Sequence, residues 1–241
     1  MGTLAVLQSF STNTMNEMPL LLLASNSPRR RELLALGGWM FGVDAANVDE
    51  SLLAGESPRN YVLRLAEAKA RAVLPRARNE HVVIGSDTSV VIDGRILGKP
   101  VDVADARAML SLLRGRSHQV FTGIAVVRVR DGRALTDLCI TDVPMRAYSD
   151  DEMDAYIRSG DPMDKAGAYG IQHAGFQPVA RMSGCFASVM GLPVCHLANL
   201  LRQVGVSPRA DVAGRCQSKM NYQCPVSRQI LKSTSELKVY V

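Results

Sequence analysis

Residues 25–31 (SNSPRRR) carry the side chains best suited to bind a phosphate group. A short apolar run gives way there to a helix start, and a helix N-terminus presents free N–H groups and a positive dipole to an anion. The hydroxyls of Ser25 and Ser27 add donors, and the guanidinium groups of Arg29 and Arg30 can hold phosphate oxygens in bidentate pairs. No Walker loop is present. A capped helix with solvated arginines remains the alternative interpretation.

Two acidic positions could activate a water molecule or hold a metal ion. Asp87 lies in residues 85–88 (GSDT), after an apolar run, where polar residues commonly face a ligand crevice. Asp49 and Glu50 precede a predicted helix. Carboxylate oxygens beside a phosphate substrate favour Mg²⁺ or Mn²⁺. An aspartate in a turn is common, so Asp87 by itself does not identify a site.

Two lysines and a Gly-containing loop are further candidates. Lys69 lies on the same face of a predicted helix as Leu65. Its ammonium group either extends to solvent at the edge of the helix or points into a cleft that binds a polyphosphate. Lys99 lies on a short turn in the sequence LGKP. Residues 164–172 (DKAGAYGIQ) allow close backbone approach to a ligand, and Gln172 could hydrogen-bond a base edge. An ordinary Gly-containing loop is the alternative.

The histidines and cysteines show no metal-binding spacing. Four histidines lie far apart and are interpreted as structural: His81, His118, His173 and His196. Five cysteines form no C-x-x-C pair: Cys139, Cys185, Cys195, Cys216 and Cys224. These spacings support neither a zinc ribbon nor a secreted disulfide framework, and predict scattered thiols in a reducing compartment.

The composition fits a globular α/β protein. Of 241 residues, 47% are hydrophobic, which allows a sizeable core and excludes a mainly disordered or fibrous chain. Aromatic residues are only 5%, which argues against base-stacking platforms. The net charge is +5, but residues 207–241 carry a net +4 and residues 1–18 carry −1, which leaves +2 on residues 19–206. The basic character therefore lies mostly in the tail, and no nucleic-acid partner is predicted.

Strand-like and helix-like segments alternate, as in a layered α/β domain. Apolar runs at residues 20–24 and 82–85 predict buried strands, and Asp-Gly turns predict hairpins at residues 93–94 and 131–132. Predicted helices begin at capping residues: Ser27, Ser57, Asp102 and Ser149. Residues 191–204 predict the last helix of the domain.

Three segments follow from this pattern. Residues 1–18 are predicted to be a flexible extension, residues 19–206 the α/β domain, and residues 207–241 a basic, irregular tail. The first 18 residues contain no Lys or Arg, and the apolar run at residues 20–24 is too short to span a bilayer. We therefore expect a cytoplasmic protein without a membrane partner, and base rates admit a homodimer.

Taken together, these segments resemble the Maf family of nucleoside triphosphate pyrophosphatases. The matching stretches occur in the family's order: residues 22–34 (LLASNSPRRRELL), 61–72 (YVLRLAEAKARA), 85–88 (GSDT), 97–100 (LGKP), 118–122 (HQVFT), 164–172 (DKAGAYGIQ) and 191–193 (GLP). They cover about residues 19–206, and the tail has no counterpart.

The resemblance implies an α/β fold in which helices flank a mixed, twisted sheet with a central nucleotide-binding cleft, as in Maf and ITPase-like proteins. It implies an enzyme that cleaves a nucleoside triphosphate to the monophosphate and pyrophosphate. Asp87 looks like the proton acceptor that activates water. By the same resemblance, Glu50, Lys69 and Lys99 look like the rest of the catalytic cluster around the phosphates and a divalent metal, and Glu50 and Asp87 look like the residues that would bind the metal.

Specificity is implied in the same way. Arg29, Thr88 and Gln172 fall at the family's specificity-determining positions and are similar to the branch that acts on dTTP and UTP, with modified pyrimidine nucleotides as a further class. The remaining predicted substrate-binding residues are Ser25, Ser27, Arg30 and Lys165. Two other classes stay open: a nucleotide-binding regulator of cell division without useful turnover, and a nucleic-acid-binding protein. The intact Asp87 and lysines argue against the first, and the absence of a groove-reading helix or RNP signature against the second.

Overall fold

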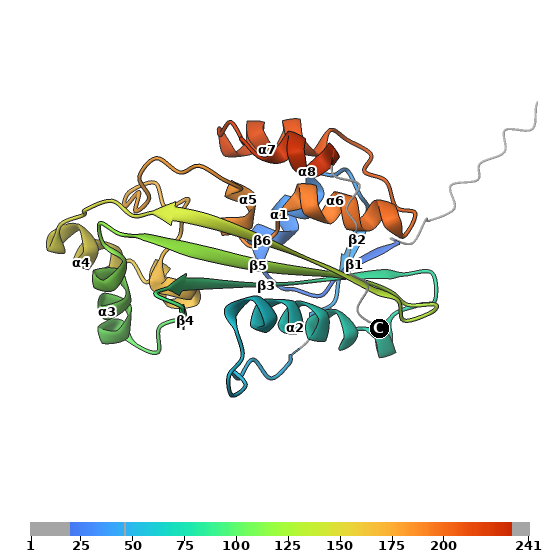
Figure 1. Cartoon of the computed structure of the whole chain (residues 1–241), viewed down its shortest axis with the longest axis horizontal. Coiled ribbons are helices and arrows are strands. Elements are labelled where there is room, and N and C mark those ends of the chain that lie inside the picture. The colour runs from blue at the N-terminus through green and yellow to red at the C-terminus, as the bar shows by residue number, and fades with distance from the viewer. Residues whose placement is uncertain (1–19, 46, 233–241) are drawn as a thin grey trace, which may run out of the picture.

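The computed structural model describes residues 20–45 and 47–232 (Figure 1). One mixed sheet has the strand order β2-β1-β3-β5-β6, with β4 also paired to β3. The strands are β1 (Leu21–Leu23), β2 (Phe41–Val43), β3 (Val82–Ile92), β4 (Arg95–Leu97), β5 (Ser117–Arg128) and β6 (Ala134–Pro144). Strands β2, β1 and β3 run parallel, and the remaining pairs are antiparallel. Both predicted Asp-Gly hairpins are confirmed.

Strand β3 organises the sheet. Along one edge it pairs with β5 from Val82 to Val91, while the other edge pairs with β1 at residues 82–84 and with β4 at residues 90–92. Residues 85–89 therefore have a free edge between the ends of two neighbouring strands. The prediction that a strand ends near Gly85 is wrong, because β3 continues through the GSDT segment.

Helices cover both faces of the sheet (Figure 1). They are α1 (Pro28–Ala35), α2 (Pro58–Arg71), α3 (Val103–Leu113), α4 (Asp150–Arg158), α5 (Phe186–Val189), α6 (Val194–Gln203), α7 (Val212–Met220) and α8 (Ser227–Lys232). Short 3₁₀ turns occur at Leu74–Arg76, Asp161–Asp164 and Ala166–Ala168. The four predicted N-caps each accept a hydrogen bond from the backbone of their helix, as capping requires.

Side chains alternate between the two faces of β3 and contribute to a different hydrophobic core on each face. Val83 faces α2, where it packs with Ala66 and Ala70. Val82 and Ile84 face the opposite side, where α1 and α6 cover the sheet. Because side chains alternate along a strand, Asp87 shares the α2 face with Val83, while Ser86 and Thr88 point to the α1 and α6 face.

Gly85 lets α2 lie against the sheet. A Cβ atom on Gly85 would be 2.0 Å from the carbonyl oxygen of Ala66, and one on Gly123 of β5 would be 2.4 Å from that of Val62. Both obstacles are helix backbone, which cannot rotate away. These two glycines therefore set the height of α2 above Asp87.

We expect Gly85→Ala to lower the free energy of unfolding by about 3 kcal/mol, because the added methyl group forces α2 off the sheet. Urea denaturation measures this loss. Gly98→Ala is the control, since nothing lies within 4 Å of its added Cβ. A loss no larger than that of Gly98→Ala would contradict the close packing.

His196 joins α6 to β6 through its Nδ1, which lies 2.7 Å from Asp137 Oδ2. Burial lowers the pKa of His196, but Asp137 and the neighbouring Cys139 thiol raise it to about 10. A folded-state pKa above the unfolded value gives stability that is complete below about pH 6.5 and is lost as the pH rises toward 10.

We therefore expect the free energy of unfolding to fall between pH 7 and 10 by on the order of 2 kcal/mol more in the unmodified protein than in His196→Gln. Urea titrations of both proteins across this range give the difference, which removes the contribution of other titrating groups. Parallel pH curves would show that the His196 ion pair does not stabilise the fold.

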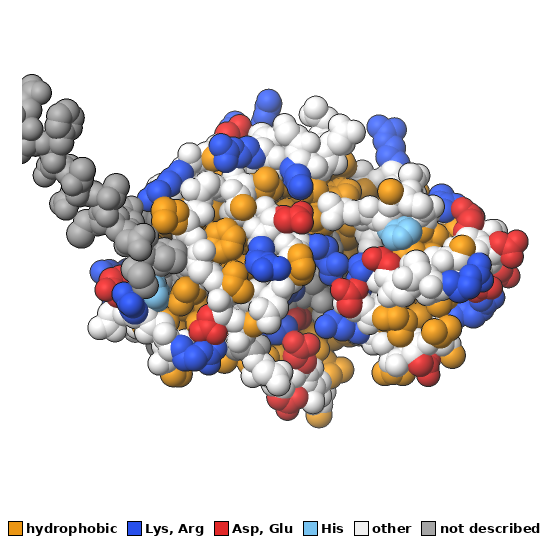
Figure 2. Space-filling view, turned by 180° about the vertical axis from the view of Figure 1, so that it is seen from behind, with side chains coloured by type: hydrophobic (Ala, Val, Ile, Leu, Met, Phe, Trp, Pro, Cys, Tyr) orange, Lys and Arg blue, Asp and Glu red, His pale blue; other side chains and the backbone are white. Residues whose placement is uncertain are grey.

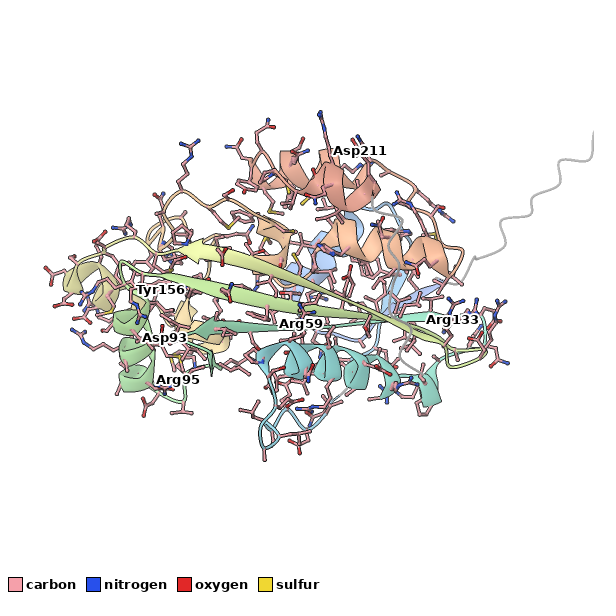
Figure 3. All side chains as sticks on the ribbon, viewed as in Figure 1. Arg59, Asp93, Arg95, Arg133, Tyr156 and Asp211 are labelled. Atoms are coloured by element: carbon pink, nitrogen blue, oxygen red, sulfur yellow. The ribbon has the colours of Figure 1, made fainter. Side chains whose placement is uncertain are left out.

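The prediction of an irregular tail over residues 207–241 is wrong for two stretches, which form α7 and α8. Asp211 caps α7 by accepting a hydrogen bond from Gly214 N at 3.0 Å (Figure 3). Apolar side chains of this segment pack on the core formed by α1 and α6: Val212, Ala213, Cys216, Met220, Val226, Ile230 and Leu231. The predicted flexible extension at residues 1–18 lies outside the described residues, as do residues 233–241.

The cysteines are free thiols, as expected, but the predicted scatter is wrong for four of them. A second, small cavity between α5, α6 and α7 is lined by these four: Cys185, Cys195, Cys216 and Cys224. Within residues 20–45 and 47–232, no helix has the length and apolar character needed to cross a membrane.

Candidate active site

A cavity of about 1100 Å³ opens at the free edge of β3. Figure 2 shows this face of the molecule, hollowed near its centre, with basic and acidic side chains around the hollow. All predicted site residues line the cavity: Ser25, Ser27, Arg29, Arg30, Glu50, Lys69, Asp87, Thr88, Lys99, Lys165 and Gln172. They come from six separate segments of the chain, which the fold brings to one place.

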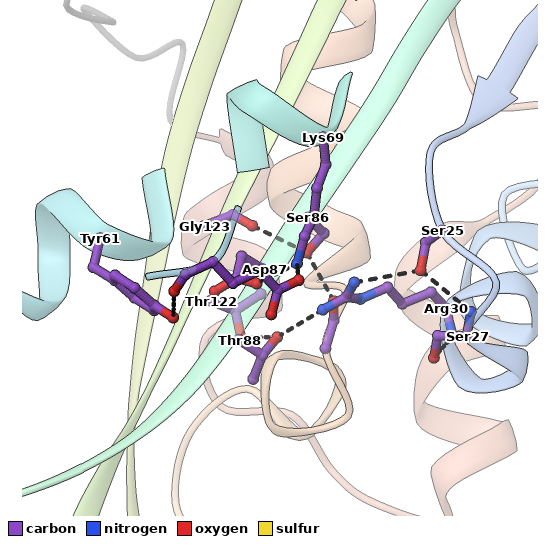
Figure 4. Close-up of polar contacts among 12 residues, drawn as sticks. Ser25, Ser27, Arg30, Tyr61, Lys69, Ser86, Asp87, Thr88, Thr122 and Gly123 are labelled. Atoms are coloured by element: carbon purple, nitrogen blue, oxygen red, sulfur yellow. Dashed lines mark hydrogen bonds and ion pairs between the residues drawn. The ribbon is translucent and has the colours of Figure 1, made fainter. Parts of the chain in front are cut away.

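Lys69 is held between two carboxylates at the centre of the cavity. Its Nζ lies 2.6 Å from Asp87 Oδ1 and 2.7 Å from Glu50 Oε1 (Figure 4 draws the contact with Asp87). Asp87 is only 6% exposed, whereas the Glu50 side chain is 53% exposed. Partial burial raises the pKa of Glu50, but Lys69, with help from Lys99 and Arg30, outweighs it and holds that pKa below its usual range. Glu50 is therefore ionised at neutral pH.

Helix α2 positions Lys69 and Glu50, whereas Asp87 lies on β3. Lys69 belongs to α2, and Tyr61 of the same helix donates a hydrogen bond from Oη to the carbonyl oxygen of Glu50 at 2.8 Å. Arg64 Nη2 donates to the carbonyl oxygen of Ser51 at 3.0 Å. The loop that carries Glu50 is thus tied to α2. The sequence interpretation missed Tyr61 and Arg64, because their partners lie outside the helix.

Arg30 connects three segments on the other side of the cavity (Figure 4). Its Nε donates to Gly191 O at 3.0 Å, Nη1 to Ser25 Oγ at 3.4 Å, and Nη2 to Thr88 Oγ1 at 3.4 Å. Burial lowers the pKa of Arg30, while the negative charges of Asp87 and Glu50 raise it in part. Since a guanidinium keeps its proton in proteins, Arg30 presents a fixed positive charge to the cavity.

The hydroxyl groups of Ser86, Thr88 and Thr122 extend the hydrogen bonds of Arg30 to the backbone beside the cavity. Thr122 Oγ1 donates to Ser188 O at 2.8 Å, so its contact with Thr88 Oγ1 at 3.1 Å requires Thr88 to be the donor. Ser86 Oγ lies 3.0 Å from Gly123 O and 2.9 Å from Gly191 O. Ser86, Thr122 and Gly191 are functional neighbours that the sequence interpretation did not single out as site residues.

Gly191 also explains why the last predicted helix starts late. Residues 191–204 were expected to be helical, yet α6 begins at Val194. Gly191 has a φ of +106°, and its missing side chain leaves room for Arg30 and Thr88, whose atoms lie 3.2 and 3.3 Å from where a Cβ would be. The turn at Gly191 therefore presents a carbonyl oxygen to Arg30 in place of another helical turn.

The opposite rim of the cavity carries Lys165, Gln172 and Lys99. Lys165 Nζ lies 3.0 Å from Asp161 Oδ1 and 2.6 Å from Asp164 Oδ1, so its charge is shared with carboxylates of its own loop. Gln172 is exposed, and its Nε2 lies 3.7 Å from Met220 Sδ. Lys99 is exposed on the turn after β4. The structure thus brings these residues to the cavity without placing them in the Lys69 cluster.

The donor set suits a hard divalent ion. In the part of the chain that the structure describes, no group of three His, Cys, Asp or Glu side chains is arranged to hold a metal. Mg²⁺ is bound by one or two carboxylates, with water and substrate phosphates completing its shell. Asp87 and Glu50, which converge on one ammonium group, supply two such carboxylates. The residues therefore fit Mg²⁺ or Mn²⁺ bound together with a phosphate ligand.

Comparison with known proteins gives consistent results. A family model described as Maf-like protein matches residues 20–204. A dTTP/UTP pyrophosphatase of Geotalea uraniireducens (strain Rf4) is 47% identical over 186 residues, which are 77% of this chain and 95% of that protein. A dTTP/UTP pyrophosphatase of Vibrio cholerae serotype O1 is 47% identical over 185 residues, 76% of this chain and 97% of that protein.

Among solved structures, a nucleoside-triphosphatase / dITP/XTP pyrophosphatase of Mycobacterium abscessus covers 76% of this chain and 93% of its own, with a TM-score of 0.39 and 15% identity. The range that the family model matches includes Glu50, Lys69 and Asp87. The chain belongs to the Maf family.

Proposed function

We propose that the protein is a nucleoside triphosphate pyrophosphatase that hydrolyses dTTP and UTP to the monophosphate and pyrophosphate. The observation that carries this proposal is the buried Asp87 carboxylate, held by Lys69 at the centre of a cavity that basic side chains surround. Membership in the Maf family and the similarity to dTTP/UTP pyrophosphatases support it.

In the proposed reaction, Asp87 is the general base. It orients a water molecule and accepts its proton while the water oxygen bonds to the α-phosphorus. The bond from that phosphorus to the α–β bridging oxygen breaks, and pyrophosphate leaves with the electron pair. Lys69, Lys99 and Arg30 neutralise the charge that develops on the phosphates, because cations fixed in a partly buried site stabilise a transition state more strongly than water does.

We assign Glu50 and Asp87 as the residues that would hold Mg²⁺ or Mn²⁺. When bound, such an ion supplies charge neutralisation on the phosphate oxygens and makes a water molecule more acidic. The nearby Lys69 helps to keep Glu50 ionised, and its ion pairs hold both carboxylates toward the cavity. Arg29 and Ser27 at the start of α1 would bind the outer phosphates through the helix N-terminus.

Base recognition is assigned to Thr88 and Gln172, at opposite sides of the cavity. A site that hydrogen-bonds a substrate group rejects analogues that leave its polar atoms unpaired. Since Thr88 already donates to Thr122, its free lone pair and the Gln172 amide are the groups available to a pyrimidine edge. Lys165 and the backbone of residues 164–172 would close around the nucleoside.

The test is a panel of nucleoside triphosphates with Mg²⁺ or Mn²⁺, in which monophosphate and pyrophosphate are measured separately. We expect dTTP and UTP to be hydrolysed with the highest kcat/KM. No turnover of any triphosphate would refute the enzyme and leave the nucleotide-binding regulator, and equal kcat/KM for GTP would refute only the base preference. A cytoplasmic location, a homodimer and the lack of a nucleic-acid partner stay predictions that accompany this function.

A further inference from the structure

We propose that residues 207–232, which follow the region matched by the family model, support the substrate site from outside the cavity, with Tyr222 as a positioning residue for the turn at Gly191. The kinetic part of this proposal rests on the proposed function. The segment was expected to be an irregular tail, yet it packs against the elements that line the cavity.

The segment is fixed to the domain at both ends. Trp39 Nε1 donates to Ser207 O at 3.0 Å, and Arg209 N donates to Gly37 O at 2.9 Å. Asn199 Nδ2 of α6 donates to Ile230 O in α8 at 2.6 Å. Figure 1 shows α7 and α8 lying over α6 on the side away from α2. These anchors give the segment a defined place relative to the cavity.

Between its ends, the segment places Tyr222 against Gly184. Helix α7 ends at Met220, and Asn221 takes the left-handed conformation with a φ of 45°, which turns the chain toward α5. Tyr222 Oη then accepts a hydrogen bond from Gly184 N at 3.0 Å and donates one to Gly184 O at 2.9 Å. One hydroxyl thus satisfies both backbone polar groups of Gly184.

Gly184 is suited to this contact by its backbone. Its φ is +153°, which side-chain-bearing residues rarely adopt, and a Cβ there would lie 2.9 Å from Thr141 Cγ2. The Tyr222 ring also lies beside Phe186, with 5.6 Å between the ring centroids. Tyr222 therefore contacts Gly184, two residues before α5, and Phe186, the first residue of α5.

Helix α5 transmits this contact to the cavity. It has only four residues, too few to be stable alone, so its position depends on tertiary contacts. Thr122 Oγ1 holds its middle through Ser188 O at 2.8 Å, and further contacts lie beyond its two ends. At the far end, Gly191 O accepts from Arg30 Nε and lies 2.9 Å from Ser86 Oγ. Tyr222 and Arg30 therefore hold opposite ends of the same segment, residues 184–191.

Two further contacts join the segment to lining elements. Met220 Sδ lies 3.7 Å from Gln172 Nε2, on the loop assigned to base recognition. Lys219 Nζ lies 3.7 Å from Glu32 Oε2 on α1, the helix that carries Arg29 and Arg30. Neither Asp87 nor Lys69 belongs to an element that Tyr222 touches, so we expect the segment to change KM much more than kcat.

The test compares Tyr222→Phe with Tyr148→Phe in the full chain. Tyr222→Phe removes the hydroxyl and keeps the ring. Tyr148→Phe removes a buried hydroxyl that donates to Leu110 O at 2.6 Å and has no link to α5. We expect Tyr222→Phe to speed amide hydrogen exchange at residues 184–191 by about tenfold, and to raise KM for dTTP or UTP about fivefold at nearly constant kcat.

Tyr148→Phe should leave both the exchange at residues 184–191 and KM unchanged. Unchanged exchange and KM in Tyr222→Phe, or equal changes in both variants, would overturn the positioning role. A protein that hydrolyses no triphosphate would refute the proposed function alone, because the exchange measurement still decides whether Tyr222 holds the α5 turn.

Discussion

Replacing Asp87 with asparagine is expected to lower kcat for dTTP and UTP by about 10³-fold, because an amide cannot accept the proton of the attacking water. The side chain keeps its volume, and Lys69 keeps its contact with Glu50 at 2.7 Å. The cavity should therefore keep its shape. Binding of a non-hydrolysable α,β-methylene triphosphate should persist, since the change removes a negative charge from a site for polyanions.

Asp93→Asn is the matched control for this variant. Asp93 lies in the β3–β4 turn, exposed and outside the cavity (Figure 3), and pairs with Arg116 at 2.8 Å. Exposed ion pairs of this kind contribute little to the free energy of unfolding. Asparagine also tolerates the φ of 50° at this position. Its kcat should match that of the unmodified protein. An Asp87→Asn enzyme that keeps more than about a tenth of the original kcat would exclude Asp87 as the base.

The features that could be predicted from the sequence have local causes. Ser57 caps α2 because its hydroxyl lies beside the N–H of Asn60, three residues along the chain at 3.3 Å. The turn at residues 93–94 forms because Asp93 and Gly94 both adopt a positive φ. Such signals need only neighbouring residues, and the four predicted N-caps and both hairpin turns are confirmed.

The continuity of β3 has a non-local cause and could not be predicted. A glycine followed by Ser86 and Asp87 reads as the end of a strand, since glycine weakens strands. In the structure Gly85 is required by the backbone of α2, which is 19 residues away at Ala66. The site residues were found because of their chemistry and the family resemblance, whereas Tyr61 was missed because its hydroxyl binds the backbone of a distant loop.

Helix α7 is a different case, because its signal was present in the sequence. Asp211 is a good N-cap, and Val212, Cys216 and Met220 recur at intervals of four residues. These side chains are few and the surrounding residues polar, so the stripe alone predicts little burial. The α1 and α6 surface supplies the missing apolar partner. Tertiary packing, not helix propensity, therefore decides the structure of this segment.

Replacing Lys69 with methionine is expected to lower kcat by about 10² to 10³-fold, because a fixed positive charge is lost at the phosphates while the side chain keeps most of its length. The two carboxylates would then face each other without the ammonium group that lies 2.6 Å from Asp87 and 2.7 Å from Glu50. Arg71→Met is the control, since Arg71 lies on the same helix but pairs with Glu67 on the surface.

The pH profile separates this role from a merely structural one. Lys69 now holds the pKa of Glu50 below its usual range, so Glu50 stays ionised as the pH falls. Without the ammonium group, repulsion between the carboxylates favours the protonated form, and the pKa of Glu50 rises. The acidic limb of kcat against pH should therefore move to higher pH in Lys69→Met and stay in place in Arg71→Met. A reduced kcat with an unmoved acidic limb would mean that Lys69 acts on the substrate without setting the ionisation of Glu50.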